Sequence, residues 1–169
     1  MTRRPRAPLP NDGAAGATRA LGGRALAGFA AGAAAVLTVH QGALAVLGAA
    51  GASPWPAYST APTPPLGVPA VWSAAFWGGL WGIGLAAVAA PSSTSPSAAR
   101  ELGRAAAFGA VLPNLVGAAL LAAGRGPATA ERALSPAAAL VTAVVVNGLW
   151  GAATAVILRA LRRCVGSAW

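Results

Sequence analysis

Few side chains in this 169-residue chain could do acid–base or coordination chemistry inside an apolar environment. The only histidine, His40, lies within a long apolar run and is followed directly by Gln41. An ionisable residue in such a run is a functional candidate by default, because an imidazole titrates near neutral pH. It can equally hydrogen-bond a neighbouring helix and hold a bundle together. The sequence leaves both interpretations open.

Amides and hydroxyls in the other apolar runs extend this chemistry. Four side chains form a candidate polar seam: His40, Gln41, Asn114 and Asn147. Thr38 and Thr142 could join them. Such a seam either lines a path for a small substrate or supplies hydrogen bonds between helices. The apolar runs contain no Asp or Glu, which argues against a proton relay.

The sequence lacks the patterns that mark common enzymes. It has no G-x-S-x-G motif, no paired acids in an apolar run and no histidine–acid set for a metal. Cys164 is the only cysteine, so no intramolecular disulfide can form. Its place beside Arg162 and Arg163 predicts a reduced cytoplasmic thiol. We therefore expect no enzymatic activity, no catalytic residue, no metal and no cofactor.

The composition indicates a membrane protein. The chain is 56% hydrophobic and only 9% charged, whereas soluble domains carry roughly 25% charged residues. The twelve basic residues are all arginine, and with the three acids they lie outside the apolar runs. A net charge of +9 could suggest a nucleic-acid partner, but the arginines are not interleaved with aromatics. The predicted partner is the lipid bilayer.

Four apolar runs are each long enough to cross a bilayer as a helix, which takes about 20 residues. They cover residues 26–50, 68–90, 105–123 and 136–158. The first is too long for the apolar region of a signal peptide. The sequence thus predicts an all-α membrane protein with a four-helix domain over 25–161. A disordered basic tail over 1–24 and a short tail over 162–169 flank it.

The arginines predict the orientation. Ten lie in the two tails or between the second and third spans, and two lie between the third and fourth. The loop over 51–67 has no charge. Because positive loops stay in the cytoplasm, both termini should be cytoplasmic in a multi-pass protein of the bacterial inner membrane.

Glycine and tryptophan recur together in the second and fourth spans. Gly78 and Gly82 form a G-xxx-G pair, which permits close helix approach in lipid. On a helical wheel they share a face with Ala75, Gly79 and Ala86. The predicted helix-packing set is Gly78, Gly79, Gly82, Trp77, Trp81, Gly148, Trp150 and Gly151.

The two halves of the chain are similar. "GGLWG" at 78–82 matches "NGLWG" at 147–151 with an offset of 69, and "AVLTVHQGA" at 35–43 matches "AVLPNLVGA" at 110–118 with an offset of 75. We interpret this as a tandem repeat of one helical hairpin, related by an axis along the membrane normal. Chance similarity between Ala- and Gly-rich helices is the alternative. In the repeat, Asn147 takes the place of Gly78 and should face the bundle interior.

The loop over 51–70 contains six prolines, which predict a stiff, extended segment. Trp55, Tyr58 and Trp72 flank the expected membrane boundary, as an aromatic belt would. An interfacial cap over the bundle is the expected role, with partner binding as the alternative.

Three stretches, "VHQGALAVL", "APTPPLGVPAVWSAAFWGGLWG" and "VNGLWG", resemble a group of small uncharacterised bacterial inner-membrane proteins. That group has a His-Gln pair in its first helix and this proline-rich loop. The resemblance covers roughly residues 25–160, and the arginine-bearing N-terminal tail extends beyond it. It implies a four-helix membrane protein and, because the group has no assigned activity, no functional residue.

The sequence supports two functions. The leading hypothesis is a non-enzymatic structural or accessory membrane protein, which could form a homo-oligomer through an unused small-residue face. The alternative is a small transporter or channel lined by the polar seam around His40. Water access to His40 distinguishes them, because a transport path must be wet.

Overall fold

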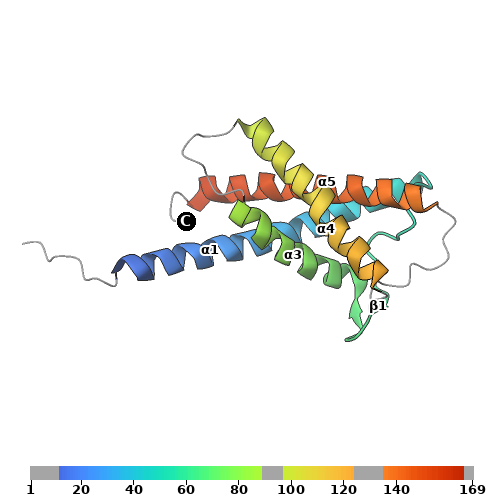
Figure 1. Ribbon diagram of the computed structural model, residues 1–169, viewed down its shortest axis with the longest axis horizontal. Helices are drawn as coiled ribbons and strands as arrows, with labels where there is room; N and C mark the ends of the chain where they lie inside the picture. Colours follow the sequence, from blue (N-terminus) through green and yellow to red (C-terminus); the bar gives the residue numbers. More distant parts are fainter. Residues whose placement is uncertain (1–11, 89–96, 124–134, 166–169) are drawn as a thin grey trace, which may run out of the picture.

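The computed structural model describes residues 12–88, 97–123 and 135–165. Within these ranges the chain is helical apart from one short strand pair and its connecting loop (Figure 1). The elements in order are α1 (Asp12–Ala35), the π-helical turn η1 (Val36–His40), α2 (Gln41–Ala49), β1 (Pro62–Thr63), β2 (Val68–Pro69), α3 (Ala70–Val88), α4 (Ala98–Ala122) and α5 (Pro136–Val165).

Among the residues that the structure describes, four helical segments are long and apolar enough to cross a membrane: Ala14–Ala49, Ala70–Val88, Ala98–Ala122 and Pro136–Cys164. The first combines α1, η1 and α2 into one continuous helix, because both ends of the π-helical turn keep right-handed helical backbone angles. The protein is therefore an all-α polytopic membrane protein.

The helices extend further into polar sequence than the apolar runs do. α1 begins at Asp12, so the described part of the tail expected to be disordered over 1–24 is helical, and residues 1–11 lie outside the described ranges. α4 begins seven residues before the predicted span, and α5 continues to Val165. These extensions are rich in Ala, Leu and Arg, which favour helix whether or not lipid surrounds them.

The helices pack mainly in two antiparallel pairs. α1 packs against α3, and α4 packs against α5, each pair crossing obliquely (Figure 1). α5 also crosses α1, and this contact joins the two pairs. Small clusters of buried residues fill the junction: Ala35, Val36, Ala75 and Trp150 in one cluster, and Ala31, Ala86 and Leu158 in another. Among the described elements, α4 packs only against α5 and α3.

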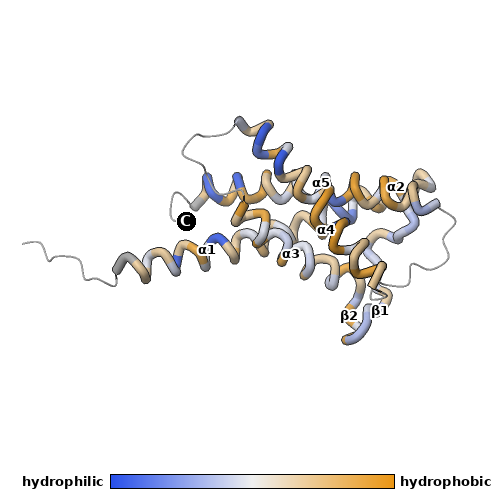
Figure 2. Tube along the Cα trace, in the orientation of Figure 1, coloured by the Kyte–Doolittle hydropathy of each residue, from blue (hydrophilic) through white to orange (hydrophobic). Residues whose placement is uncertain are grey.

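Large apolar side chains cover the outside of the bundle, as lipid-facing surfaces require. They include Leu80 on α3, Leu115 on α4 and Leu149 on α5. Figure 2 shows the hydrophilic residues gathered at one end, over the start of α4 and the end of α5. We call this the charged end, and we call the opposite end, which carries residues 50–69, the loop end.

The loop end is more ordered than the predicted extended segment. β1 and β2 pair antiparallel, with Pro62 opposite Pro69 and Thr63 opposite Val68. Side-chain bonds tie the loop to the helices. The backbone N–H of Tyr58 donates to Gln41 Oε1 at 2.6 Å, and the Thr142 hydroxyl donates to the carbonyl of Ala52 at 2.7 Å. Prolines remove amide donors, but these contacts fold the loop back onto the bundle.

Candidate functional site

The closest helix contact in the first pair is made by four glycines. Gly28 and Gly32 on α1 face Gly82 and Gly78 on α3. A Cβ on Gly82 would lie 2.2 Å from the Gly28 carbonyl oxygen, and one on Gly32 would lie 2.2 Å from the Gly78 oxygen. Real Cβ atoms do not approach a carbonyl so closely. Only glycine allows the two backbones this separation.

The second pair repeats this contact with other residues. A Cβ on Gly151 would lie 2.1 Å from the carbonyl oxygen of Ala105, and one on Gly109 would lie 2.2 Å from that of Asn147. Gly151 and Asn147 lie 69 residues after Gly82 and Gly78, as in the sequence alignment.

For the first helix of each pair, α1 and α4, the structural contacts give a different residue offset between the two halves than the sequence alignment does. In these contacts Ala105 and Gly109 take the places of Gly28 and Gly32, which lie 77 residues earlier. The sequence similarity gave 75 for this helix. η1 lies within the aligned letters 35–43, and its one-residue expansion of the helix can account for one of the two residues of difference.

The glycines predicted to pack differ in how tightly they do so. Gly79 faces the ring of Phe29, and a Cβ there would lie 2.6 Å from two ring carbons. A Cβ on Gly148 would lie 3.6 Å from its nearest neighbours, the Ala106 oxygen and the Ala110 Cβ. Gly148 is therefore in ordinary contact distance and does not set the helix separation.

Trp150 joins the two helix pairs. Its side chain is buried, with 2% of its surface exposed, and its indole N–H donates to the carbonyl oxygen of Gly32 at 2.9 Å. An indole N–H satisfied in this way fixes the rotation of α5 against α1.

The two tryptophans of α3 occupy different environments. Trp81, the repeat counterpart of Trp150, is half-buried and meets Phe108 of α4 edge-on, with ring centroids 6.2 Å apart. Trp77 is 58% exposed and makes an edge-on contact with Phe76 of its own helix. Trp77 therefore lies on the lipid-facing surface and not at the helix interface where the sequence placed it.

The structure brings together only one pair of the candidate polar seam. The Asn147 amide donates to Asn114 Oδ1 at 2.9 Å, and the Asn114 amide donates to the Ala110 carbonyl at 2.9 Å. Asn147 thus faces α4, inside the second helix pair. This contact supplies an interhelical hydrogen bond in a span that Pro113 deprives of one backbone N–H.

The remaining polar residues of the seam are held elsewhere. Gln41 is buried and accepts from the loop at Tyr58, while the Tyr58 hydroxyl donates to the Leu37 carbonyl at 3.2 Å. Thr38 bonds within its own helix. His40 ends the π-helical turn, and its buried Nδ1 has no hydrogen-bond partner among the described residues.

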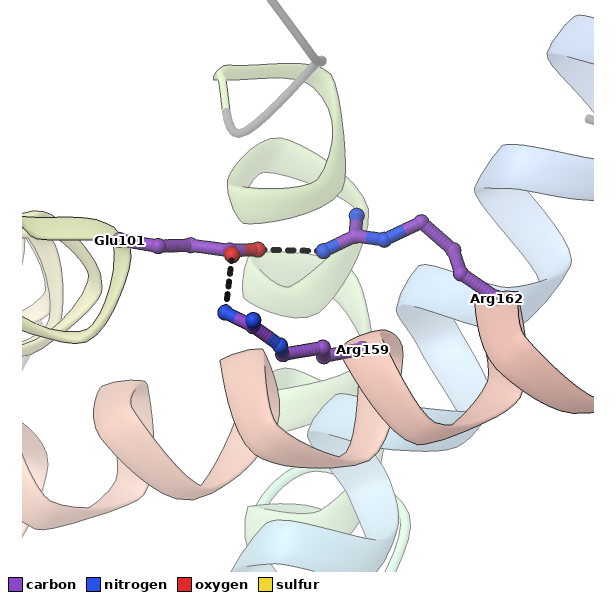
Figure 3. Close-up of polar contacts among 3 residues, drawn as sticks. All are labelled: Glu101, Arg159 and Arg162. Carbon is purple, nitrogen blue, oxygen red and sulfur yellow. Dashed lines mark hydrogen bonds and ion pairs between the residues drawn. The ribbon is translucent and has the colours of Figure 1, made fainter. Parts of the chain in front are cut away.

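A charged cluster at the other end of the bundle was missed from the sequence. Glu101 of α4 accepts hydrogen bonds from Arg159, at 3.3 Å, and from Arg162, both on α5 (Figure 3). The two arginines are three residues apart and so share a helix face. That spacing is the signal the sequence offers, but the predicted third span begins only at residue 105, after Glu101.

Within residues 12–88, 97–123 and 135–165, no three His, Cys, Asp or Glu side chains gather as a metal site would require. The arrangement supports helix packing and hydrogen bonding between helices. Comparison with protein-family models, curated proteins and solved structures finds no match to this chain.

Proposed function

We propose that this chain is a non-enzymatic structural or accessory component of the bacterial inner membrane. The observation that carries the proposal is that polar side chains of the helices hydrogen-bond to other parts of the chain. Asn147 bonds to Asn114, Gln41 to the loop, and Thr142 to the Ala52 carbonyl. Groups that bond to one another hold helices together and are not free to coordinate a passing solute.

The matched glycine contacts support a tandem-hairpin origin for this scaffold. In each pair a glycine of the second helix packs against the backbone of the first helix at an equivalent position, Gly82 against Gly28 and Gly151 against Ala105. Two hairpins built alike are joined through the bond from Trp150 to Gly32. Such an arrangement suits a scaffold that holds a partner or organises lipid.

Both termini are proposed to be cytoplasmic. Arg159 and Arg162 lie at the charged end with Glu101, and the loop end carries no charged residue between 50 and 69. Positive residues are retained on the cytoplasmic side, so the charged end is assigned there.

One observation favours the alternative, a small transporter or channel. His40 Nδ1 is buried without a partner among the described residues, at a π-helical turn. Turns of this kind often occur at functional sites. A pathway through the bundle would have to bring water to this nitrogen.

Thiol accessibility tests both functions. In a Cys164→Ser background, His40→Cys and Asn147→Cys variants are treated with a membrane-impermeant thiol reagent, in intact cells and in inverted membrane vesicles. Thr60→Cys and Ser97→Cys serve as controls, because both positions are exposed and lie at opposite ends of the bundle.

A scaffold leaves positions 40 and 147 unlabelled from both sides. The Thr60→Cys variant should label in intact cells and the Ser97→Cys variant only in inverted vesicles. Labelling at either inner position would favour the transport function. Reversed labelling of the two controls would overturn the proposed orientation without deciding between the functions.

A further inference from the structure

A short hairpin projects sideways from the loop end of the bundle (Figure 1). We call residues 61–70 the hairpin finger; it consists of β1, a turn and β2. Leu66 lies in the turn and is 83% exposed, and Val68 on β2 is 37% exposed. Large apolar side chains at a tip that points away from the helices need a cover.

The finger has few backbone N–H groups to desolvate. Prolines occupy four of its positions and carry no amide N–H: Pro62, Pro64, Pro65 and Pro69. The Gly67 N–H donates to the Thr63 carbonyl at 2.9 Å, and the Ala70 N–H donates to that of Ala61 at 2.9 Å. The Thr63 hydroxyl donates to the Val68 carbonyl at 2.7 Å. Unbonded N–H groups help to keep loops out of lipid, and the prolines and these bonds leave the finger few of them, while its carbonyls can accept hydrogen bonds in the hydrated headgroup region.

The surface next to the finger is itself lipid-facing. α3 begins directly after β2, and its first two turns carry exposed aromatic side chains. These are Trp72, Phe76 and Trp77, each more than half exposed. Tryptophan in the first turn of a span is typical of the membrane–water interface. The sequence between Arg24 and Arg100 contains no charged residue that would hold the finger in water.

We propose that the hairpin finger inserts into the headgroup region of the leaflet at the loop end and anchors α3 there. The expected depth is that of other interfacial anchors, roughly 5–10 Å into the headgroup–acyl boundary. The occupant of the exposed tip is lipid, and Leu66 is the residue that enters it. Anchored in this way, the finger sets the depth and tilt of α3, as interfacial side chains do for other spans.

Fluorescence quenching in pure lipid vesicles tests the proposal. Leu66→Cys is made in the Cys164→Ser background, labelled with an environment-sensitive dye and reconstituted in phosphatidylethanolamine–phosphatidylglycerol vesicles. Spin-labelled lipids carry the quencher either near the headgroup or near the end of the acyl chain. Thr18→Cys is the aqueous control, because it is exposed and lies on the part of α1 that precedes the predicted span over 26–50, and Leu80→Cys, in the middle of α3, is the deep control.

The dye at position 66 should emit at shorter wavelength than the dye at position 18. It should lose more intensity to the shallow quencher than to the deep one, whereas position 80 shows the reverse order. Emission and quenching equal to those at position 18 would overturn the proposal. So would a blue shift that disappears when the protein is diluted in lipid, because the tip would then be covered by a second copy.

Discussion

Replacing Gly151 with alanine should separate α4 from α5, whereas the same change at Gly148 should not. The two glycines are three residues apart on one helix. A Cβ at position 151 would meet the Ala105 carbonyl oxygen at 2.1 Å, and one at position 148 would meet nothing closer than 3.6 Å. Since both variants gain the same intrinsic helix propensity, the difference between them isolates the packing effect.

The size of this difference follows from the overlap. An ordinary contact between carbon and a carbonyl oxygen is roughly 3.3 Å or more, so the helices must move apart by about 1 Å. Overpacking of this kind costs about 1–3 kcal/mol, and the gap it opens weakens neighbouring dispersion contacts. The propensity gain of about 1 kcal/mol for alanine applies at both positions. Gly151→Ala should therefore be about 1–3 kcal/mol less stable than Gly148→Ala.

The free energy of unfolding in mixed detergent micelles measures this difference, with helicity followed by circular dichroism. The first hairpin offers an internal replicate. A Cβ added to Gly82 would lie 2.2 Å from the Gly28 carbonyl oxygen, whereas a Cβ added to Gly84 would lie 3.5 Å from its nearest neighbour, the edge of the Phe108 ring. Equal stability of the Gly151→Ala and Gly148→Ala variants would refute the close approach of α4 and α5.

Three further changes test the remaining contacts. Trp150→Phe removes the buried indole hydrogen bond and should lower the free energy of unfolding by about 1–3 kcal/mol. Trp77→Phe, on the exposed surface, should lower it by less than about 0.5 kcal/mol. Equal losses would contradict the burial of Trp150. Glu101→Gln should lose about 1 kcal/mol in low salt and less in high salt, measured by the same unfolding assay; a salt-independent loss would argue against ion pairing. A double-mutant cycle between Asn114→Ala and Asn147→Ala should give a coupling of about 0.6 kcal/mol, and additive effects would show that the amides do not meet.

The four spans could be predicted from the sequence because lipid imposes a strict requirement. A run such as residues 136–158 must be helical to bond its own backbone. The small-residue face of α3 was also predictable, since helical geometry alone places Gly78 and Gly82 on one side. The structure buries both against α1.

Other features needed the partner helix. Trp77 and Trp81 both flank that glycine face, yet Trp81 meets Phe108 of α4 whereas Trp77 is 58% exposed. Which side of α3 faces a neighbour depends on where the partner helices lie. The polar seam failed for the same reason. Periodicity places His40, Gln41 and Asn147 on their own helices but does not tell which neighbour each one faces.

Composition and run length were enough to predict four helices that are long and apolar enough to span a membrane, because the thickness of the bilayer sets the length of such a run. The contact of Glu101 with Arg159 and Arg162, and the folding of the proline-rich loop into a hairpin that points sideways, are seen only in the folded chain. These features arise between segments distant in the sequence. They depend on how closely the glycines let two helices approach, and the sequence of one helix does not specify that distance.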